Sequence, residues 1–269
     1  MVVVDGGSPI LGTNVSVDFS TKNQIKRQLA ANIDSDDQLR FNGDVDCKIN
    51  VGFMLRSDAG GYEGLYHLFD NYHGTGANAM VLDIGNNQYS GCYVDSFSLT
   101  VKPFEPVVGN VTFSCFRPST TSLAGISDDS VNDDLDTDNI IYGHNCSLTG
   151  AGFVVASDII NNLTYSKTYT RTPVYTLGSQ FASDFLVDGV EVDMSVDSTG
   201  LNSIIDFSGK KIISDFGVYI QDGGNSGIDY NSVDFDLTVS AGAHVTAEGY
   251  SINAGETLVT KASIKEVIL

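Results

Sequence analysis

The amino-acid sequence predicts a mainly β protein made of two tandem antiparallel β-sandwich or barrel domains, each with one short α-helix. Three observations predict this class: apolar and polar residues alternate with period two, turn-forming Gly is frequent at 28 positions, and one pattern of elements occurs twice in 269 residues. We expect residues 1–120 to form the first domain, residues 121–140 an acidic linker, and residues 141–269 the second domain.

The clearest strand pattern lies in residues 45–55, where every odd position is apolar. Such alternation is typical of a strand that buries one face. The second half repeats it with Val190, Val192, Met194 and Val196. We therefore expect equivalent strands in the two halves.

A short helix is expected after each of these strands. In the first half, the residues with the i, i+3, i+4, i+7 spacing of one buried helix face are Leu65, Leu68, Phe69 and Tyr72. In the second half, the first three spacings recur at Leu201, Ile204 and Ile205.

The repeat continues towards the end of each half. Residues 97–101 (FSLTV) match residues 235–239 (FDLTV) at four of five positions. Two further matches occur in the same order: residues 111–112 with 245–246, and residues 14–17 with 145–148. The recurrence of strand, turn, helix and strand in order indicates a duplicated domain.

Three segments fit this plan less well. Residues 127–139 contain six Asp and no basic residue, which is typical of a solvated linker. We interpret residues 18–44 and 150–185 as long hairpins or arms that leave the sandwich and contact a neighbour.

The charge balance excludes several classes of partner. The chain has 14 Lys and Arg against 34 Asp and Glu, a net charge of −20. This charge excludes a DNA-binding protein with a basic groove, and it opposes binding to an anionic membrane surface. The N-terminus lacks the pattern of a secretory leader, and no segment reaches the length of a membrane span. We expect the protein to be made in a cytoplasm-like compartment.

The sequence predicts no metal site and no cofactor. The four cysteines are far apart and are expected to be buried free thiols: Cys47, Cys92, Cys115 and Cys146. Asp134, Asp136 and Asp138 have the opening spacing of a calcium loop, but the turn Gly and the final Glu are missing, so we interpret them as part of the linker.

No catalytic motif is present, and the protein is not expected to be an enzyme. Neither a nucleophile elbow, a phosphate-binding Gly loop nor a zinc-protease helix occurs in the sequence. A carbohydrate-active β-sandwich enzyme remains an alternative, although the absence of Trp removes the commonest platform for stacking a sugar.

A cluster of basic residues lies in the first proposed arm, beside Asp34, Asp36 and Asp37. It is either an exposed loop of mixed charge or an arm that binds an acidic face of another copy. For the second hypothesis, the residues expected to contact the next copy are Lys22, Ile25, Lys26, Arg27 and Leu29.

In both halves, a helix follows an alternating strand and a terminal two-strand element comes later. This element lies in residues 94–101 and 111–116, and again in residues 233–239 and 245–249. This arrangement resembles the bacteriophage tail tube (major tail) proteins. The duplication resembles the rarer members with two tandem tube domains. The resemblance implies a virion structural protein that is assembled in the host cytoplasm and forms stacked rings in the tail, through which DNA is ejected.

The same resemblance implies the partners. The chain is expected to bind itself, with a trimer of pseudo-sixfold symmetry favoured over a hexamer, because both copies keep the features of a ring-forming domain. Tape-measure, sheath, terminator or baseplate proteins are further expected partners, and DNA is a non-specific cargo. The alternative is a tandem β-sandwich decoration or receptor-binding protein of a virion surface.

Overall fold

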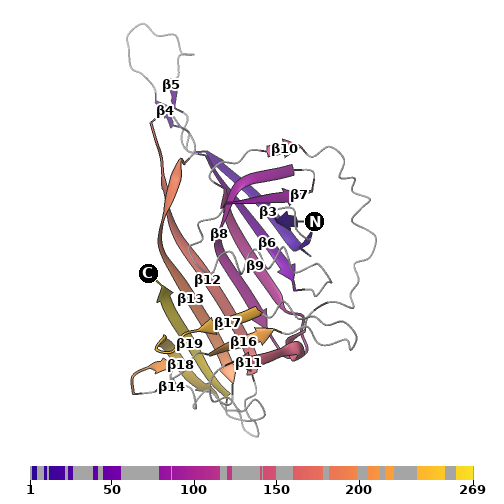
Figure 1. Ribbon diagram of the computed structural model, residues 1–269, viewed down its shortest axis with the longest axis vertical. Coiled ribbons are helices and arrows are strands. Elements are labelled where there is room, and N and C mark those ends of the chain that lie inside the picture. The colour runs from indigo at the N-terminus through magenta and orange to yellow at the C-terminus, as the bar shows by residue number, and fades with distance from the viewer. Residues whose placement is uncertain are drawn as a thin grey trace.

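The computed structural model describes residues 2–4, 9–10, 12–21, 24–26, 39–41, 45–55, 79–85, 87–115, 120–122, 140, 142–149, 160–177, 182–198, 205–206, 208–212, 216–220, 235–251 and 259–268. These residues form a mainly β fold in which one sheet has 14 strands, a second has three and a third has two (Figure 1). Within these ranges, the 3-10 turn Gly143–Asn145 is the single helical segment. The predicted mainly β, antiparallel class is confirmed.

The first half of the chain contributes five strands that neighbour one another in a fixed order. This order is β3 (Gly12–Thr21), β6 (Val45–Met54), β9 (Val108–Cys115), β8 (Asn87–Val101) and β7 (Met80–Ile84). Three short strands extend this group: β1 (Val2–Val4), β2 (Pro9–Ile10) and β10 (Thr120–Ser122).

The second half contributes a group with the same order. Its strands are β12 (Ile160–Val174), β13 (Asp184–Ser198), β19 (Val259–Ile268), β18 (His244–Ser251) and β15 (Lys211–Ile212), followed by β14 (Ile205–Asp206). In chain order, both halves place their first, second, fifth, fourth and third strands side by side.

The irregularities of the two groups also coincide. In the first and second strands, the register shifts between Gly12 and Asn14 in one half and between Ile160 and Asn162 in the other. In the fourth and fifth strands, the shifts fall between Val94 and Ser96 and between Val245 and Ala247. Because a bulge fixes the register around it, these positions define which residues of the two halves are equivalent.

The two groups are fused into one sheet by antiparallel pairing of β8 with β12, from Val101 opposite Leu163 to Ser96 opposite Thr168 (Figure 1). The buried apolar residues likewise form one cluster that includes Val51 and Phe113 of the first half and Met194 and Ile264 of the second. Two separate sandwiches are therefore not confirmed, because the sheet and its core continue across the predicted boundary.

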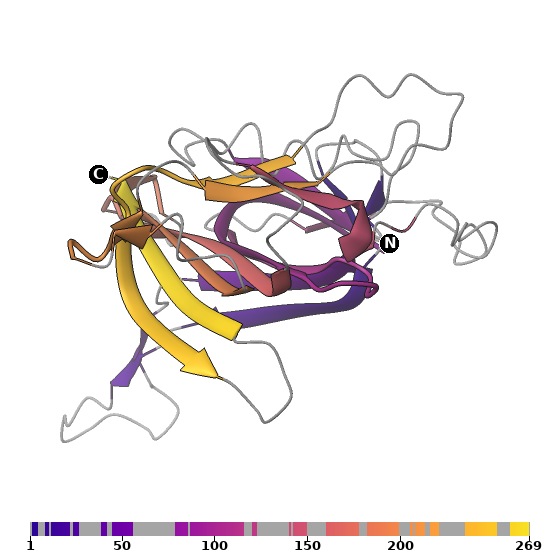
Figure 2. The same ribbon diagram turned by 90° about the horizontal axis from the view of Figure 1, so that it is seen from below.

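A small sheet of β11 (Cys146–Thr149), β16 (Phe216–Ile220) and β17 (Phe235–Val239) lies across one face of the main sheet (Figure 2). Val239 is fully buried in the common core. The predicted equivalence of residues 97–101 with 235–239 is wrong in topology, since the former lie in β8 of the main sheet. The shared sequence encodes a half-buried strand, and such a pattern does not specify the neighbours of that strand.

Two other proposed equivalences fail for the same reason. Residues 14–17 lie in β3 of the main sheet, whereas residues 145–148 end a turn and enter β11. By the bulges, Val245 is equivalent to Val94 rather than to Val111. The match of residues 45–51 with 190–196 holds, because these residues occupy the same positions in β6 and β13.

The helices and linker fall mostly outside the described residues. Residues 56–78, 201–204 and 123–139 are not described. Ile205, which was expected in the second helix, lies instead in β14 opposite Ile212, because its backbone pairs with a strand. Thr121 and Ser122, expected in the linker, pair with β8.

The arm interpretation is partly wrong. In the first segment, residues 18–21 belong to β3, and β4 (Gln24–Lys26) pairs with β5 (Leu39–Phe41) beyond the end of the main sheet (Figure 1). In the second segment, residues 160–174 form β12, a central strand. Its alternate residues Leu163 and Tyr165 are buried, so the core rather than a neighbouring molecule holds this segment.

The expectation of free thiols is wrong for one pair of cysteines. Cys92 and Cys115 form a disulfide between directly opposite positions of β8 and β9, with their Cα atoms 4.0 Å apart. Antiparallel pairing brings opposite residues this close, which spacing along the chain does not show. Cys47 is free and buried, and burial raises the pKa of its thiol to about 11.

Gly109 provides a test of the packing. It lies opposite Phe53 and Leu99, and an added Cβ would come within 2.8 Å of Leu99 Cδ2 and Phe53 Cε2. We expect Gly109→Ala to lower the free energy of unfolding by about 1–3 kcal/mol, as overpacking a core does. Chemical denaturation of the unassembled protein measures it. Gly249→Ala is the control, because nothing lies within 4 Å of its added Cβ, and equal losses in both variants would contradict this packing.

Candidate functional site

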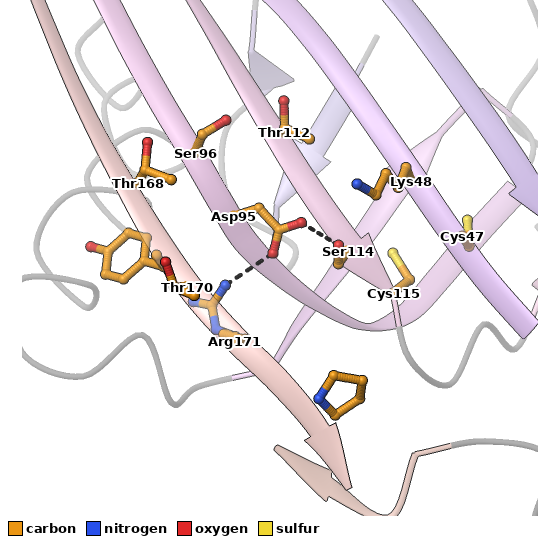
Figure 3. A pocket seen from close by; sticks show the side chains of 12 residues that line it. Cys47, Lys48, Asp95, Ser96, Thr112, Ser114, Cys115, Thr168, Thr170 and Arg171 are labelled. Atoms are coloured by element: carbon orange, nitrogen blue, oxygen red, sulfur yellow. Dashed lines mark hydrogen bonds and ion pairs between the residues drawn. The ribbon is translucent and has the colours of Figure 1, made fainter. Parts of the chain in front are cut away.

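The place where the two halves join contains a buried charged cluster. Arg171 of β12 reaches β8, where its Nη1 atom lies 3.1 Å from Asp95 Oδ1 and also donates a hydrogen bond to the carbonyl oxygen of Val94 (Figure 3). The Arg171 side chain is 2% exposed. A buried guanidinium is stable only when it is paired in this way.

Aromatic rings surround the same guanidinium. Its Cζ atom lies 5.0 Å from the ring centroid of Tyr169, 5.7 Å from that of Tyr93 and 5.8 Å from that of Phe185. Tyr93 and Phe185 also contact each other edge to face at 4.3 Å. These rings come from β12, β8 and β13, so cation–π contacts tie the cation to both halves of the chain.

The bulge in β8 explains why Arg171 fits here. On one edge of β8, β7 pairs as far as Cys92, and β12 begins to pair at Ser96. The carbonyl of Val94 lies between these two strands, and the Arg171 side chain supplies the hydrogen bond that a strand would otherwise give. The guanidinium thereby spans the gap between β7 and β12.

Burial and the neighbouring groups have opposite effects on the pKa of Asp95. Burial raises the pKa of the Asp95 carboxyl, whereas the Ser114 hydroxyl that donates to it and the charges of Arg171 and Lys48 act in the opposite direction. The raised pKa means that desolvation outweighs the partners. Ser114, Arg171 and Lys48 therefore offset only part of the cost of burying this carboxylate.

A pocket of about 500 Å³ opens beside this cluster. It is lined by β6, β9, β8 and β12 through Cys47, Lys48, Asp95, Ser96, Thr112, Ser114, Cys115, Thr168, Tyr169, Thr170, Arg171 and Pro173 (Figure 3). The lining residues include several with hydroxyl groups and no His. The Ser114 hydroxyl donates a hydrogen bond to the Asp95 carboxylate. The pocket lies at the junction of the two halves, between strands of the first half and β12 of the second.

The face of the main sheet opposite the core is polar and continues across both halves. On this face, Asn50 Nδ2 donates to Ser16 Oγ at 3.2 Å, and Thr112 Oγ1 donates to Asn50 Oδ1 at 2.9 Å. The same row continues by register through Ser96 and Thr168. All five side chains are exposed or half-buried, so no second layer covers this row.

Charged residues also lie on this face, and some of them form ion pairs. In the second half, Lys265 Nζ lies 2.7 Å from Glu191 Oε2, and Lys261 Nζ lies 3.3 Å from Asp197 Oδ2. The hydrogen bond to Glu191 raises the pKa of Lys265. This polar face therefore presents hydroxyl, amide and paired charged groups rather than a strong field of one sign.

The residues expected to stack rings are only partly visible. Ile25 and Lys26 lie in β4, although their side chains are not described, and Lys22, Arg27 and Leu29 lie outside the described residues. The same is true of Asp134, Asp136 and Asp138. Among the residues that are described, no group of His, Cys, Asp and Glu side chains could hold a metal ion, and no helix could span a membrane.

Sequence reasoning missed Arg171 and Asp95. A usable signal was present, because Arg171 is the one cation in the otherwise uncharged run of residues 168–177, and alternation with Tyr169 places it on the core face. Its partner could not be found in this way, since Asp95 lies 76 residues earlier in the chain.

Comparisons with known proteins leave the family open. No protein-family model matches the chain, and no curated protein matches it.

The charged pair predicts a specific stability pattern. Arg171→Met leaves the half-buried Asp95 without its guanidinium, so we expect a loss of about 3 kcal/mol in the free energy of unfolding at neutral pH, at the low end for a broken buried pair. The double variant with Asp95→Asn should lose less than the sum of the single losses. Denaturant unfolding checks this, and Glu105→Gln, which breaks the exposed pair of Lys102 and Glu105, should change stability by less than about 0.5 kcal/mol.

The deficit of Arg171→Met should also depend on pH. Without the cation, the folded pKa of Asp95 moves further above its ordinary value of 3.8. The folded variant then holds a proton that the unfolded chain has lost, so its stability rises as the pH falls through this window. Unfolding measured at pH 7 and at lower pH should show a narrowing gap to the parent protein, and a constant gap would contradict the assignment.

Proposed function

We propose that the protein is a virion structural protein that assembles into stacked rings forming a phage tail tube, through which DNA is ejected. The observation that carries this proposal is the strand order that occurs twice and is fused into one sheet with an apolar face and a polar face. A ring needs repeated units with matching edges. A chain with two fused units would supply two of the six units in a six-domain ring.

The polar face supports a role as the wall of a conduit. Its hydroxyl and amide groups and its paired charges, such as Lys265 with Glu191, offer phosphates no cationic field. The net charge of −20 acts in the same direction. Lysines and arginines on the wall would instead bind the phosphates and gain affinity from counterion release.

Each half is proposed to act as one tail-tube-like domain, with residues 1–120 and 141–269 as the two copies. The equivalent bulges at Val94–Ser96 and Val245–Ala247 support this division. Since a six-domain ring needs three such chains, we propose a trimer with pseudo-sixfold symmetry. Tape-measure, sheath, terminator and baseplate proteins are the proposed neighbours in the tail.

The assembly state tests this function directly. At high concentration the purified protein should form rings or tubes in electron micrographs, and native mass spectrometry should give a ring mass of three chains. Rings of six chains would contradict the trimer. A protein that stays monomeric at every concentration would contradict the tube.

Ring stacking is proposed to use the basic arm that contains Lys26 of β4. Changing Lys22, Lys26 and Arg27 to Glu should leave rings intact but stop tube growth, because the arm would then repel an acidic ring surface. Tube length in electron micrographs measures the effect. The matched control is Lys102→Glu on an exposed loop, and tubes of normal length from the triple variant would contradict the arm.

A further inference from the structure

Two of the long strands in the main sheet, β3 and β18, have an edge that is wholly or partly without a partner strand in the described part of the chain. The strand β3 pairs with β6 along one edge, and no described strand pairs with the other. The strand β18 pairs with β19, and its opposite edge meets β15 only at His244. The edge of residues 247–251 is therefore open among the residues that are described.

The strands equivalent to β3 and β18 pair with each other inside the chain. The bulges make β12 the equivalent of β3, with Asn162 corresponding to Asn14, and make β8 the equivalent of β18, with Ser96 corresponding to Ala247. The pairing of β8 with β12 is the junction between the halves. The described part of the chain thus contains this strand pair once, as β8 with β12. The equivalent strands β18 and β3 lie at the outer parts of the same sheet.

The edge of β18 beyond β15 corresponds to the edge of β8 beyond β7, which β12 occupies. The strand β7 stops pairing at Cys92, and β12 occupies β8 from Ser96 onwards. Likewise, the amide of Ile212 in β15 donates to the carbonyl of Ala243, the equivalent of Cys92, and β15 goes no further than His244 and Val245. A strand can therefore add to β18 from Ala247 onwards, as β12 does on β8.

We propose that β3 of one chain pairs in antiparallel orientation with β18 of a second copy of this chain, in the register of the internal β12–β8 pair. Transferring that register places Asp18 opposite Gly249, as Ser166 is opposite Ser98, and Ser16 opposite Ser251, as Thr164 is opposite Thr100. This inference rests on the proposed self-assembly and names the surfaces that carry it.

The exposure of β3 side chains supports this partner. In β12, Leu163 is 0% and Lys167 9% exposed. Their equivalents in β3, Val15 and Phe19, are 38% and 53% exposed. The apolar face of β3 therefore extends past the core that covers it, and a neighbouring β18 would continue that core.

The edge itself also favours strand addition. A long exposed edge with apolar side chains and no Pro is a template for pairing unless charges, bulges or a covering element protect it. The strand β3 is 10 residues long, contains no Pro and carries one charged residue, Asp18. Because the two edges differ, the contact is head to tail, and such contacts close into a ring when the rotation allows.

Disulfide trapping tests the register. Two single variants, Asp18→Cys and Gly249→Cys, are mixed and oxidised, so that any link between these positions joins two chains. Opposite residues in an antiparallel pair have Cα atoms within disulfide reach. We expect a linked dimer whose proteolytic peptides, identified by mass spectrometry, join position 18 to position 249, and Ser16→Cys mixed with Ser251→Cys should behave alike.

A register-shifted mixture is the matched control. Asp18→Cys with Ser251→Cys lies two residues out of register and should give at least about tenfold less linked dimer, since diagonal positions exceed disulfide reach. Rings or tubes in electron micrographs without the predicted links would overturn this interface but leave the proposed function standing. Equal links in both registers would also overturn it, and the absence of any assembly would overturn both proposals.

Discussion

The pairing of β8 with β12 is the constraint on which the rest of the structure depends. It makes one sheet and one core out of two groups of strands that are far apart in the sequence. It also brings Arg171 to the gap between β7 and β12, where the guanidinium bonds to Asp95 and Val94. Without this strand pair, the buried cation would have no carboxylate partner and the polar face would end at each half.

The pair of Arg171 and Asp95 constrains the register of β12 against β8. Burial raises the pKa of Asp95 despite its partners, which shows that desolvation is incompletely offset. A shift of β12 along β8 would move the guanidinium away from its carboxylate and from the rings of Tyr93 and Phe185. Such a misplaced charge is expensive, so one alignment of the two halves is strongly preferred.

The internal repeat connects this junction with the proposed assembly. The halves join through the β8–β12 edge pair, and in the described part of the chain the equivalent edges, along β3 and along residues 247–251 of β18, have no partner strand. Repeating one geometry is how a ring is made from identical parts. In the assembly that we propose, the polar face, with its ion pairs, would continue from one chain to the next.

The sequence by itself determined the mainly β class and the strands of residues 45–55 and 190–196, because period-two alternation depends only on which face of a strand is buried. Residues 97–101 and 235–239 look alike for that reason, yet they lie in different sheets. The tertiary structure alone decided the neighbours of each strand, the disulfide of Cys92 with Cys115, and the pairing of Arg171 with Asp95. Those contacts join residues distant in the chain, and no local pattern records which distant residue will lie opposite.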